Sequence, residues 1–238
     1  MESSALLCFD RALAARLRPV VEKRSIRLIE VAPARMTPSP EPRAWARAVS
    51  ELPLFNWLLL PTEHAVAALL EAASALPPPT VRLAALDPAA KALAAAGRTP
   101  DLRAASLGEL VVRLEPGLGR SQRILVPHAA AAGRFLGDRL RARGADPTCV
   151  PAYDLAGDPE TLTVVTNCRH LAAILEGTQE AENLRALLGS NGRDSADRLW
   201  VMALTAAAAD GAEDCGFSFV HRPERDVGPF LSATLSKT

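Results

Sequence analysis

The feature that most constrains the fold of this chain is a long-period duplication of a strand–helix–strand unit. Each copy opens with a strand-like apolar run, continues through a helical stretch, and closes with a second apolar run that leads into small residues. Periods this long, carried by strands and helices, predict two similar α/β domains rather than a solenoid of short units. The paired segments are residues 57–60 with 162–165, 81–86 with 199–204, and 87–90 with 205–208.

A second strand–helix–strand pair alternates with the first along the chain. It occupies residues 5–31 and returns at residues 123–150, where Gly144 stands at the position of a helix C-cap glycine. Ser106, followed three residues later by Glu109, has the form of a capping box that starts another helix. Strands that alternate with helices predict parallel sheets flanked by helices, and ligands bind at the carboxyl ends of such strands.

Two proline-bearing segments interrupt this pattern, near residues 33–42 and 147–159, and both have the composition of extended connectors. Two connectors between alternating units predict that the chain crosses twice between its domains. A split into two contiguous halves is the alternative. The first arrangement gives a discontinuous domain of residues 1–34 plus 154–238 and a second domain of residues 37–152, whereas the alternative gives residues 1–120 and 121–238.

The composition is that of a globular protein with enough apolar residues to bury a substantial core. Hydrophobic residues make up 49% of the 238 residues, and the formal net charge is zero, which argues against a broad nucleic-acid surface. No run approaches the roughly 18 apolar residues of a membrane span, and the N-terminus lacks the pattern of a secretory signal. The four cysteines show no CxxC spacing, which argues against a disulfide framework or a zinc knuckle. We therefore expect a cytoplasmic protein that binds neither nucleic acid nor membrane.

Four blocks of the chain carry family-like motifs. Residues 81–114 are similar to "VAAVGPxTAxALxxxG…P…TxxGLxxxL", and residues 123–155 to "VLLPRxxxARxxLxxxLxxxGAxVxxVxVYxT". Residues 6–11 are similar to "VLVTRP", and residues 58–66 to "VIFTSxNAV". In these blocks and in the order of its units, over nearly its whole length, the chain resembles the uroporphyrinogen-III synthase family of the tetrapyrrole pathway.

The resemblance implies an enzyme with two α/β domains joined by a two-stranded linker. Such an enzyme cyclises the linear tetrapyrrole hydroxymethylbilane to uroporphyrinogen III, inverting the last pyrrole ring through a spiro intermediate, without a cofactor or metal. Its small-molecule substrate carries eight carboxylates and is held between the domains, largely by strand-end loops and backbone amides. Helix N-termini and arginine side chains suit such a polyanion. We expect the enzyme to act as a monomer.

Tyr153 is the only tyrosine, and it lies where the family has the tyrosine of its "VYxT" motif. The resemblance implies that Tyr153 is the acid that helps to expel the terminal hydroxyl of the substrate; the alternative is a packing residue beside the connector. Residues at the predicted strand-end loops match positions implied to bind substrate carboxylates, although threonine and asparagine there also serve as ordinary helix N-caps. The implied substrate-binding residues are Arg11, Thr62, Glu63, His64, Asp87, His128, Thr166, Asn167, Cys168 and Thr205.

Two equivalent loops, at residues 87–90 and 205–208, depart from the family pattern. Asp87 replaces the glycine of the "GP" pair, and Thr205 replaces the same glycine in the second copy. A carboxylate at Asp87 would repel a polyanion if it pointed toward it. Two alternatives to an active enzyme follow: a catalytically impaired family member that binds a tetrapyrrole or small anion, and a periplasmic-type solute binder, which the missing secretory signal disfavours.

Histidines near the predicted strand-end loops suggest a metal site as a further alternative. His64, His128 and His170 have this placement, and His221 follows an apolar residue. Their spacing matches no ligand motif, and no cysteine or carboxylate is grouped with them. We therefore expect no metal, although a protonated His128, which replaces the arginine of "LLPR", would attract a substrate carboxylate.

Overall fold

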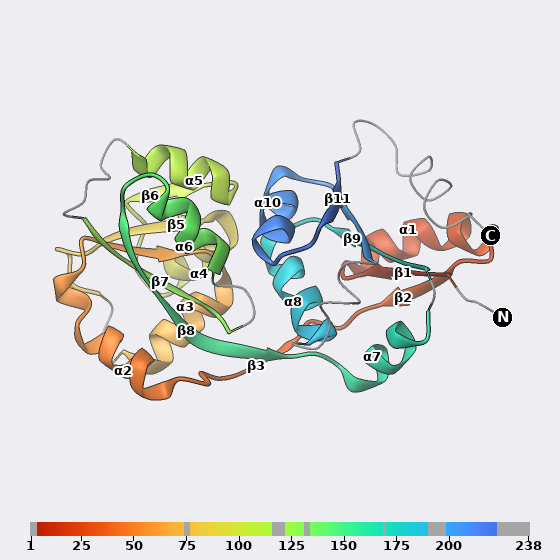
Figure 1. Cartoon of the computed structure of the whole chain (residues 1–238), viewed down its shortest axis with the longest axis horizontal. Coiled ribbons are helices and arrows are strands. Elements are labelled where there is room, and N and C mark those ends of the chain that lie inside the picture. Colours follow the sequence, from red (N-terminus) through yellow and green to blue (C-terminus); the bar gives the residue numbers. More distant parts are fainter. Residues whose placement is uncertain are drawn as a thin grey trace. The chain divides into compact units, whose positions relative to one another are not determined.

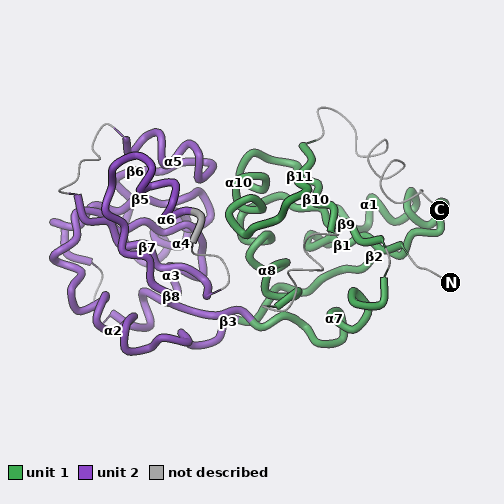
Figure 2. Tube along the Cα trace, viewed as in Figure 1, with its two compact units in different colours: residues 1–35, 156–238 green, residues 36–155 purple. Residues whose placement is uncertain are grey.

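The computed structural model of the chain describes residues 4–73, 77–115, 122–130, 134–168, 170–189 and 199–222. The chain forms two compact units, which we call unit 1 (residues 1–35 and 156–238) and unit 2 (residues 36–155) (Figure 2). Each unit has one sheet with helices packed against it (Figure 1). The α/β class with parallel sheets, predicted from the alternation of apolar runs and helices, is confirmed.

Unit 1 is built around a five-stranded sheet. Its elements are β1 (Ser4–Cys8), α1 (Arg11–Glu22), β2 (Arg27–Glu30), α7 (Pro159–Thr166), β9 (His170–Leu175), α8 (Thr178–Leu188), β10 (Leu199–Ala203), α10 (Ala206–Asp214) and β11 (Phe219–His221). The strand order is β11-β10-β9-β1-β2, and all neighbouring strands are parallel. The first two strands of the chain therefore share a sheet with the last three.

Unit 2 is built around a six-stranded sheet. Its elements are β3 (Arg35–Pro38), α2 (Pro42–Ser50), the 3-10 helix η1 (Leu52–Leu54), β4 (Trp57–Leu60), α3 (Glu63–Ala72), β5 (Arg82–Leu86), α4 (Asp87–Ala95), β6 (Leu102–Ala104), α5 (Leu107–Leu114), β7 (Arg123–Ala129), α6 (Arg134–Arg141) and β8 (Asp146–Ala156). The strand order is β3-β8-β7-β4-β5-β6, with parallel pairing from β8 through β6. The buried faces of β4, β5 and β7 pack against α5 and α6 in one apolar cluster.

Local capping interactions fix where several helices begin and end. The Ser106 hydroxyl accepts a hydrogen bond from the backbone N–H of Glu109 at 3.2 Å, which confirms the predicted start of α5. Gly144 has φ +83°, a left-handed conformation that glycine adopts without strain, and it ends the turn after α6 as predicted. Asp10 starts α1 by accepting a hydrogen bond from the N–H of Leu13 at 2.6 Å.

The two proline-bearing segments form extended backbone, as expected. They contribute β3 and β8, which are hydrogen-bonded neighbours at one edge of the unit 2 sheet. The boundaries between the units fall within these two strands, so the chain passes from one unit to the other in paired, extended segments. The hydroxyl of Ser39 donates to the carbonyl of Pro151 at 2.6 Å and ties the end of β3 to β8.

One strand of the predicted duplication is wrong. Residues 162–165 lie in helix α7, although they include β-branched residues that favour strands. The Asp158 carboxylate accepts a hydrogen bond from the N–H of Thr161 at 2.8 Å, and Pro159 takes the first helical position. These two start signals outweigh the strand preference. The strand of unit 1 that is equivalent to β4 of unit 2 is β9. The predicted equivalence of the other two strands of the duplication is correct, since they form β5 and β10.

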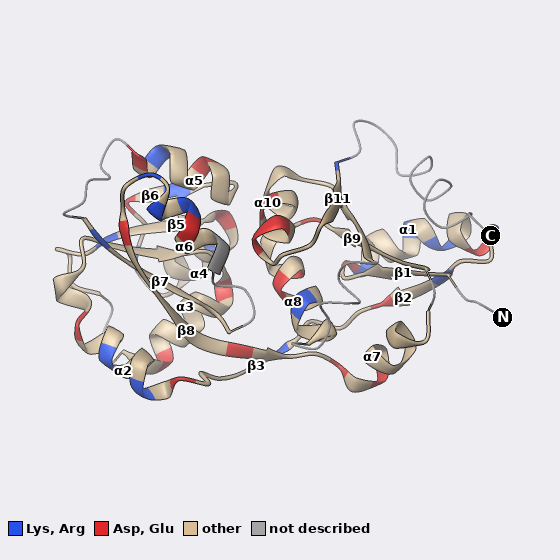
Figure 3. Cartoon of the chain, viewed as in Figure 1, with Lys and Arg blue, Asp and Glu red and all other residues tan. Residues whose placement is uncertain are grey.

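Charged side chains of both signs occur in each unit (Figure 3). Ion pairs such as Arg18–Glu30 and Arg141–Asp138 lie between exposed side chains, so each contributes little to stability. Within the described residues, no helix combines the length and apolar character needed to cross a membrane.

Candidate active site

The candidate residues of unit 2 gather at the carboxyl ends of its parallel strands. Thr62 follows β4, and Asp87 follows β5 as the first residue of α4. His128 lies one residue before the end of β7, and Tyr153 lies near the end of β8. Ligands of α/β proteins bind at this edge of a parallel sheet, so these strand ends form the candidate active site.

A buried hydrogen bond between two hydroxyl groups lies at the centre of this site. The hydroxyl oxygens of Thr62 and Tyr153 are 2.8 Å apart, and each residue is only 1% exposed. Thr62 also begins α3, because its hydroxyl oxygen accepts a hydrogen bond from the backbone N–H of Ala65 at 3.3 Å. Thr62 is thus both a helix cap and the partner of the candidate acid.

A β-bulge lies directly beside Tyr153. His128 pairs with Pro151 and Ala129 pairs with Tyr153, so Ala152 is an extra residue on β8 at this point. The bulge falls at the strand ends, where the backbone N–H of Ala130 still donates to the carbonyl of Tyr153 at 3.0 Å. Bulges redirect side chains and recur next to active sites. Here the bulge sets the direction in which the phenol leaves β8.

His64 brings a second ring to Tyr153 from the first turn of α3. The centroids of the two rings are 5.7 Å apart, and the ring planes are inclined by 30°. Glu63, the other predicted residue in this loop, is exposed. The structure therefore brings together Thr62, His64 and Tyr153 from two distant parts of the sequence.

His128 is half-buried within β7, and its Nδ1 lies 2.7 Å from the carbonyl oxygen of Ala129. Burial lowers the pKa of His128; the contact with the Ala129 carbonyl and the charge of Glu41 oppose this effect. A lowered pKa leaves the imidazole uncharged at neutral pH. His128 therefore carries less positive charge toward a substrate carboxylate than the sequence alone suggested.

Asp87 is paired with an arginine that the sequence analysis did not single out. Nε of Arg103, on the edge strand β6, donates to the carboxylate of Asp87, with both side chains about half exposed. In the sheet Arg103 lies opposite Ala85 of β5, which places it beside the start of α4. The negative charge that departs from the family pattern is thus balanced locally. No motif signalled Arg103, because its role depends on β5 and β6 being neighbours.

Two of the predicted residues of unit 1, Arg11 and Thr205, lie at the carboxyl ends of β1 and β10. Arg11 is the exposed first residue of α1, directly after Asp10. Thr205 begins α10, where its hydroxyl accepts from the N–H of Ala208 at 3.0 Å and donates to the carbonyl of Glu176 at 2.8 Å. Thr205 therefore ties the start of α10 to the loop after β9.

Carboxylates of the chain itself occupy the helix starts at this edge of unit 1. Asp10 starts α1, and the carboxylate of Glu180 accepts hydrogen bonds from the backbone N–H groups of Glu176 and Gly177. Burial raises the pKa of Glu180, and the charges of Glu176 and Asp10 add to this effect while the backbone hydrogen bonds oppose it. Burial also raises the pKa of Cys8, at the end of β1, to about 11. An incoming anion thus meets acidic groups here.

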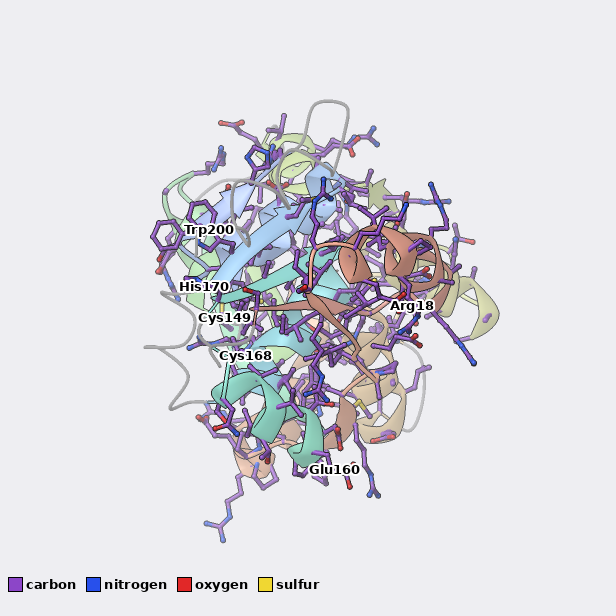
Figure 4. The ribbon with its side chains drawn as sticks, turned by 90° about the vertical axis from the view of Figure 1, so that its right-hand side faces the viewer. Arg18, Cys149, Glu160, Cys168, His170 and Trp200 are labelled. Carbon is purple, nitrogen blue, oxygen red and sulfur yellow. The ribbon has the colours of Figure 1, made fainter. Side chains whose placement is uncertain are left out.

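Thr166, Asn167 and Cys168 do not form the strand-end loop that the duplication predicted. Thr166 ends α7, and Asn167 caps it with its side-chain amide donating to the carbonyl of Thr163 at 2.8 Å. Cys168 lies between α7 and the start of β9 at His170 (Figure 4). These residues therefore precede a strand instead of following one. The loop equivalent to that of Thr62 is at residues 176–177, where β9 leads into α8.

Histidine and cysteine side chains do not assemble a metal site in the described part of the chain. Within those residues, no group of three or more histidine, cysteine, aspartate or glutamate side chains is placed to hold a metal ion. His170 begins β9 and His221 ends β11, whereas His64 lies in the first turn of a helix that follows a strand.

Comparisons with known proteins relate this arrangement to one family. The sequence model of uroporphyrinogen-III synthase HemD matches residues 14–226. A search of curated proteins finds no match. A mutant uroporphyrinogen III synthase from the extremely thermophilic bacterium Thermus thermophilus is 20% identical, covers 99% of this chain and 100% of its own, and superposes with a TM-score of 0.51, which shows a shared fold.

Two further solved structures align along the chain. Another Thermus thermophilus uroporphyrinogen III synthase is 20% identical over 97% of both chains, with a TM-score of 0.47. The uroporphyrinogen-III synthetase of Helicobacter pylori 26695 is 16% identical over 99% of this chain and 100% of its own, with a TM-score of 0.42.

Proposed function

The chain belongs to the uroporphyrinogen-III synthase family, and we propose that its chemistry is carried out at the carboxyl edge of the unit 2 sheet, with Tyr153 as the acid. The activity is the cyclisation of hydroxymethylbilane to uroporphyrinogen III in tetrapyrrole biosynthesis. The observation that supports the role of Tyr153 is its hydroxyl, held 2.8 Å from that of Thr62 at the end of β4.

The first chemical step needs a proton at the terminal hydroxyl of the substrate. In the proposed step the Tyr153 phenol transfers its proton to that oxygen while the carbon–oxygen bond breaks. Water leaves, the pyrrole ring, which keeps its N–H, becomes an electron-poor azafulvenium cation, and Tyr153 becomes a phenolate. Because Tyr153 is 1% exposed, its surroundings must open for the substrate to reach the phenol.

Closing the ring requires the two ends of the linear substrate to be held together. Positioning of this kind supplies a large part of the rate enhancement of many enzymes. We propose that the residues at the strand ends of unit 2 bind substrate carboxylates, and, considered separately, that Arg11 and Thr205 of unit 1 can do so. His64 and His128 serve in unit 2 as hydrogen-bonding groups. The acidic groups around Glu180 make the carboxyl edge of the unit 1 sheet a less favourable place for carboxylates than that of unit 2.

An isomer assay tests the reaction. The protein is given hydroxymethylbilane, and the type I and type III uroporphyrins are resolved after oxidation. The expected product is enriched in type III, and product no richer in type III than the spontaneous reaction would contradict the assignment. Tyr153→Phe tests the acid: we expect the rate to fall by about 10²-fold or more, as is typical when a general acid is lost. An unchanged rate would remove Tyr153 from this role.

The setting of the reaction is part of the same proposal. We assign the enzyme to the cytoplasm, as a monomer that needs no cofactor. Sedimentation of the purified chain at several concentrations tests the monomer, since a mass that rises with concentration would contradict it.

A further inference from the structure

We infer that the Thr62 hydroxyl donates its proton to the phenolic oxygen of Tyr153, which makes Thr62 a positioning residue for the proposed acid. The distance of 2.8 Å between the two oxygens is compatible with donation in either direction. The direction decides where the phenolic proton points. The direction of donation follows from the other hydrogen bond that the Thr62 hydroxyl makes.

The hydrogen-bonding capacity of Thr62 leaves one favourable arrangement. A threonine hydroxyl has one proton to donate and two lone pairs to accept with. The backbone N–H of Ala65 uses one lone pair at 3.3 Å. Among the residues that the structure describes, the Thr62 hydroxyl has hydrogen bonds only to Ala65 and Tyr153. If Tyr153 donated to Thr62, the threonine proton would be buried with no acceptor among the described residues, a situation that buried polar groups avoid.

The surroundings hold this hydrogen bond in place. Thr62 is fixed because it begins α3, and both Thr62 and Tyr153 are 1% exposed, so bulk water does not compete for either oxygen. His64, two residues after Thr62, places its ring 5.7 Å from the ring of Tyr153. The first turn of α3 thus holds the phenol at its oxygen and beside its ring.

This direction of donation has a consequence for the proposed acid. With Thr62 as the donor, the phenolic proton of Tyr153 points away from Thr62. After that proton is transferred, the phenolate still receives the Thr62 hydrogen bond, and a hydrogen bond to the charged form stabilises it. This catalytic consequence rests on the proposed function of Tyr153, whereas the direction of donation does not.

The test exploits the single tyrosine of the chain. Its ionisation is followed by the absorbance of tyrosinate, and also by fluorine NMR after replacement with 3-fluorotyrosine, whose more acidic phenol titrates further from alkaline unfolding. Thr62→Val keeps the shape of the side chain and removes the donor. We expect the apparent pKa of Tyr153 to rise by about one pH unit in Thr62→Val, because the phenolate loses a donor. Thr62→Ser, which keeps the hydroxyl, retains the wild-type value.

Each other outcome of the titration overturns the inference. A lowered pKa in Thr62→Val would mean that Tyr153 donates to Thr62 and that the neutral phenol loses an acceptor. An unchanged pKa would mean that the hydrogen bond is absent in solution. Circular dichroism at each pH checks that the variant is folded; if Thr62→Val does not fold, Thr62→Ala removes the same donor with less bulk.

Two controls separate positioning from helix capping and from the reaction itself. Ser106→Ala removes the cap of α5, also in unit 2, and is expected to leave the pKa of Tyr153 at the wild-type value. In the active enzyme, kcat of Thr62→Val is expected to fall about tenfold while KM changes less; equal kcat in Thr62→Val and wild type overturns the positioning role. The titration needs no substrate, so a wild-type protein without type III product contradicts the proposed function alone.

Discussion

Replacing Gly211 by alanine tests a close contact between α10 and α8, which both begin at the carboxyl edge of the unit 1 sheet. A Cβ atom on Gly211 would lie 2.8 Å from the Cα of Thr178 and 3.1 Å from its Cβ and Cγ2. The nearest atom belongs to the backbone, so a new rotamer of Thr178 cannot relieve the clash. The Thr178 hydroxyl also donates to the carbonyl of Ala207 at 3.1 Å, which holds the two helices together.

The expected loss of stability follows from two opposing effects. Alanine is better than glycine in a helix interior by about 1 kcal/mol. Forcing an extra methyl group into a packed contact costs about 1–3 kcal/mol, and a contact with backbone belongs at the upper end of that range. The free energy of unfolding of Gly211→Ala should therefore fall by about 1–2 kcal/mol.

Urea unfolding followed by circular dichroism measures the difference between Gly211→Ala and wild type. If the free energy of unfolding rose by about 1 kcal/mol, as expected for a glycine-to-alanine change in a helix with no neighbour in the way, the close approach of the helices would be refuted. Adding Thr178→Ser is expected to leave most of the loss, because the clash with the backbone of residue 178 remains. Full recovery in that double variant would place the clash at the threonine methyl group and contradict the geometry.

Two further predictions concern charge and pH. Arg103→Ala should raise KM for hydroxymethylbilane about fivefold with little change in kcat, because it leaves the Asp87 carboxylate unpaired where the polyanion is proposed to bind. Asp87→Asn in the same chain should restore KM, and an unchanged KM in the single variant would argue against this role. Burial raises the pKa of the Cys8 thiol from 9.0 to about 11. The unfolded thiol therefore ionises at a lower pH than the folded one, so the contribution of Cys8 to the free energy of unfolding is constant below about pH 9 and is lost as the pH rises toward 11. Cys8→Ala should show a shallower loss of stability over that range in urea titrations, and equal slopes would count against the shift.

Local signals in the sequence predict much of the fold because they act within a few residues. The cap at Ser106 and the turn at Gly144 need only their own neighbours, and the structure contains both. Helix α7 shows where such signals compete. Its β-branched residues indicate a strand, whereas Asp158 and Pro159 indicate a helix start, and the start signals prevail.

The sequence could predict that Thr62 and Tyr153 lie near strand ends, but not how they lie relative to each other. Thr62 and Tyr153 are 91 residues apart, and their hydrogen bond exists only because β4, β7 and β8 are neighbours in one sheet. The extra residue Ala152, which redirects Tyr153, has no sequence signature. The Arg103 pairing with Asp87 likewise depends on tertiary structure. Motif matching does not predict contacts between segments that are distant in the sequence.

The position of β1 in its sheet has a consequence for the order in which the protein folds during synthesis. β1 lies between β2 and β9, and its residues Ala5 and Leu6 are fully buried. Its second neighbour starts at His170, so the edge of β1 stays uncovered until most of the chain has left the ribosome. Unit 2 is one continuous stretch, and it completes its sheet before unit 1 does. An uncovered strand edge invites wrong pairing, and contacts between distant residues form slowly. Until β9 is made, the free edge of β1 is therefore a place where the newborn chain can pair wrongly.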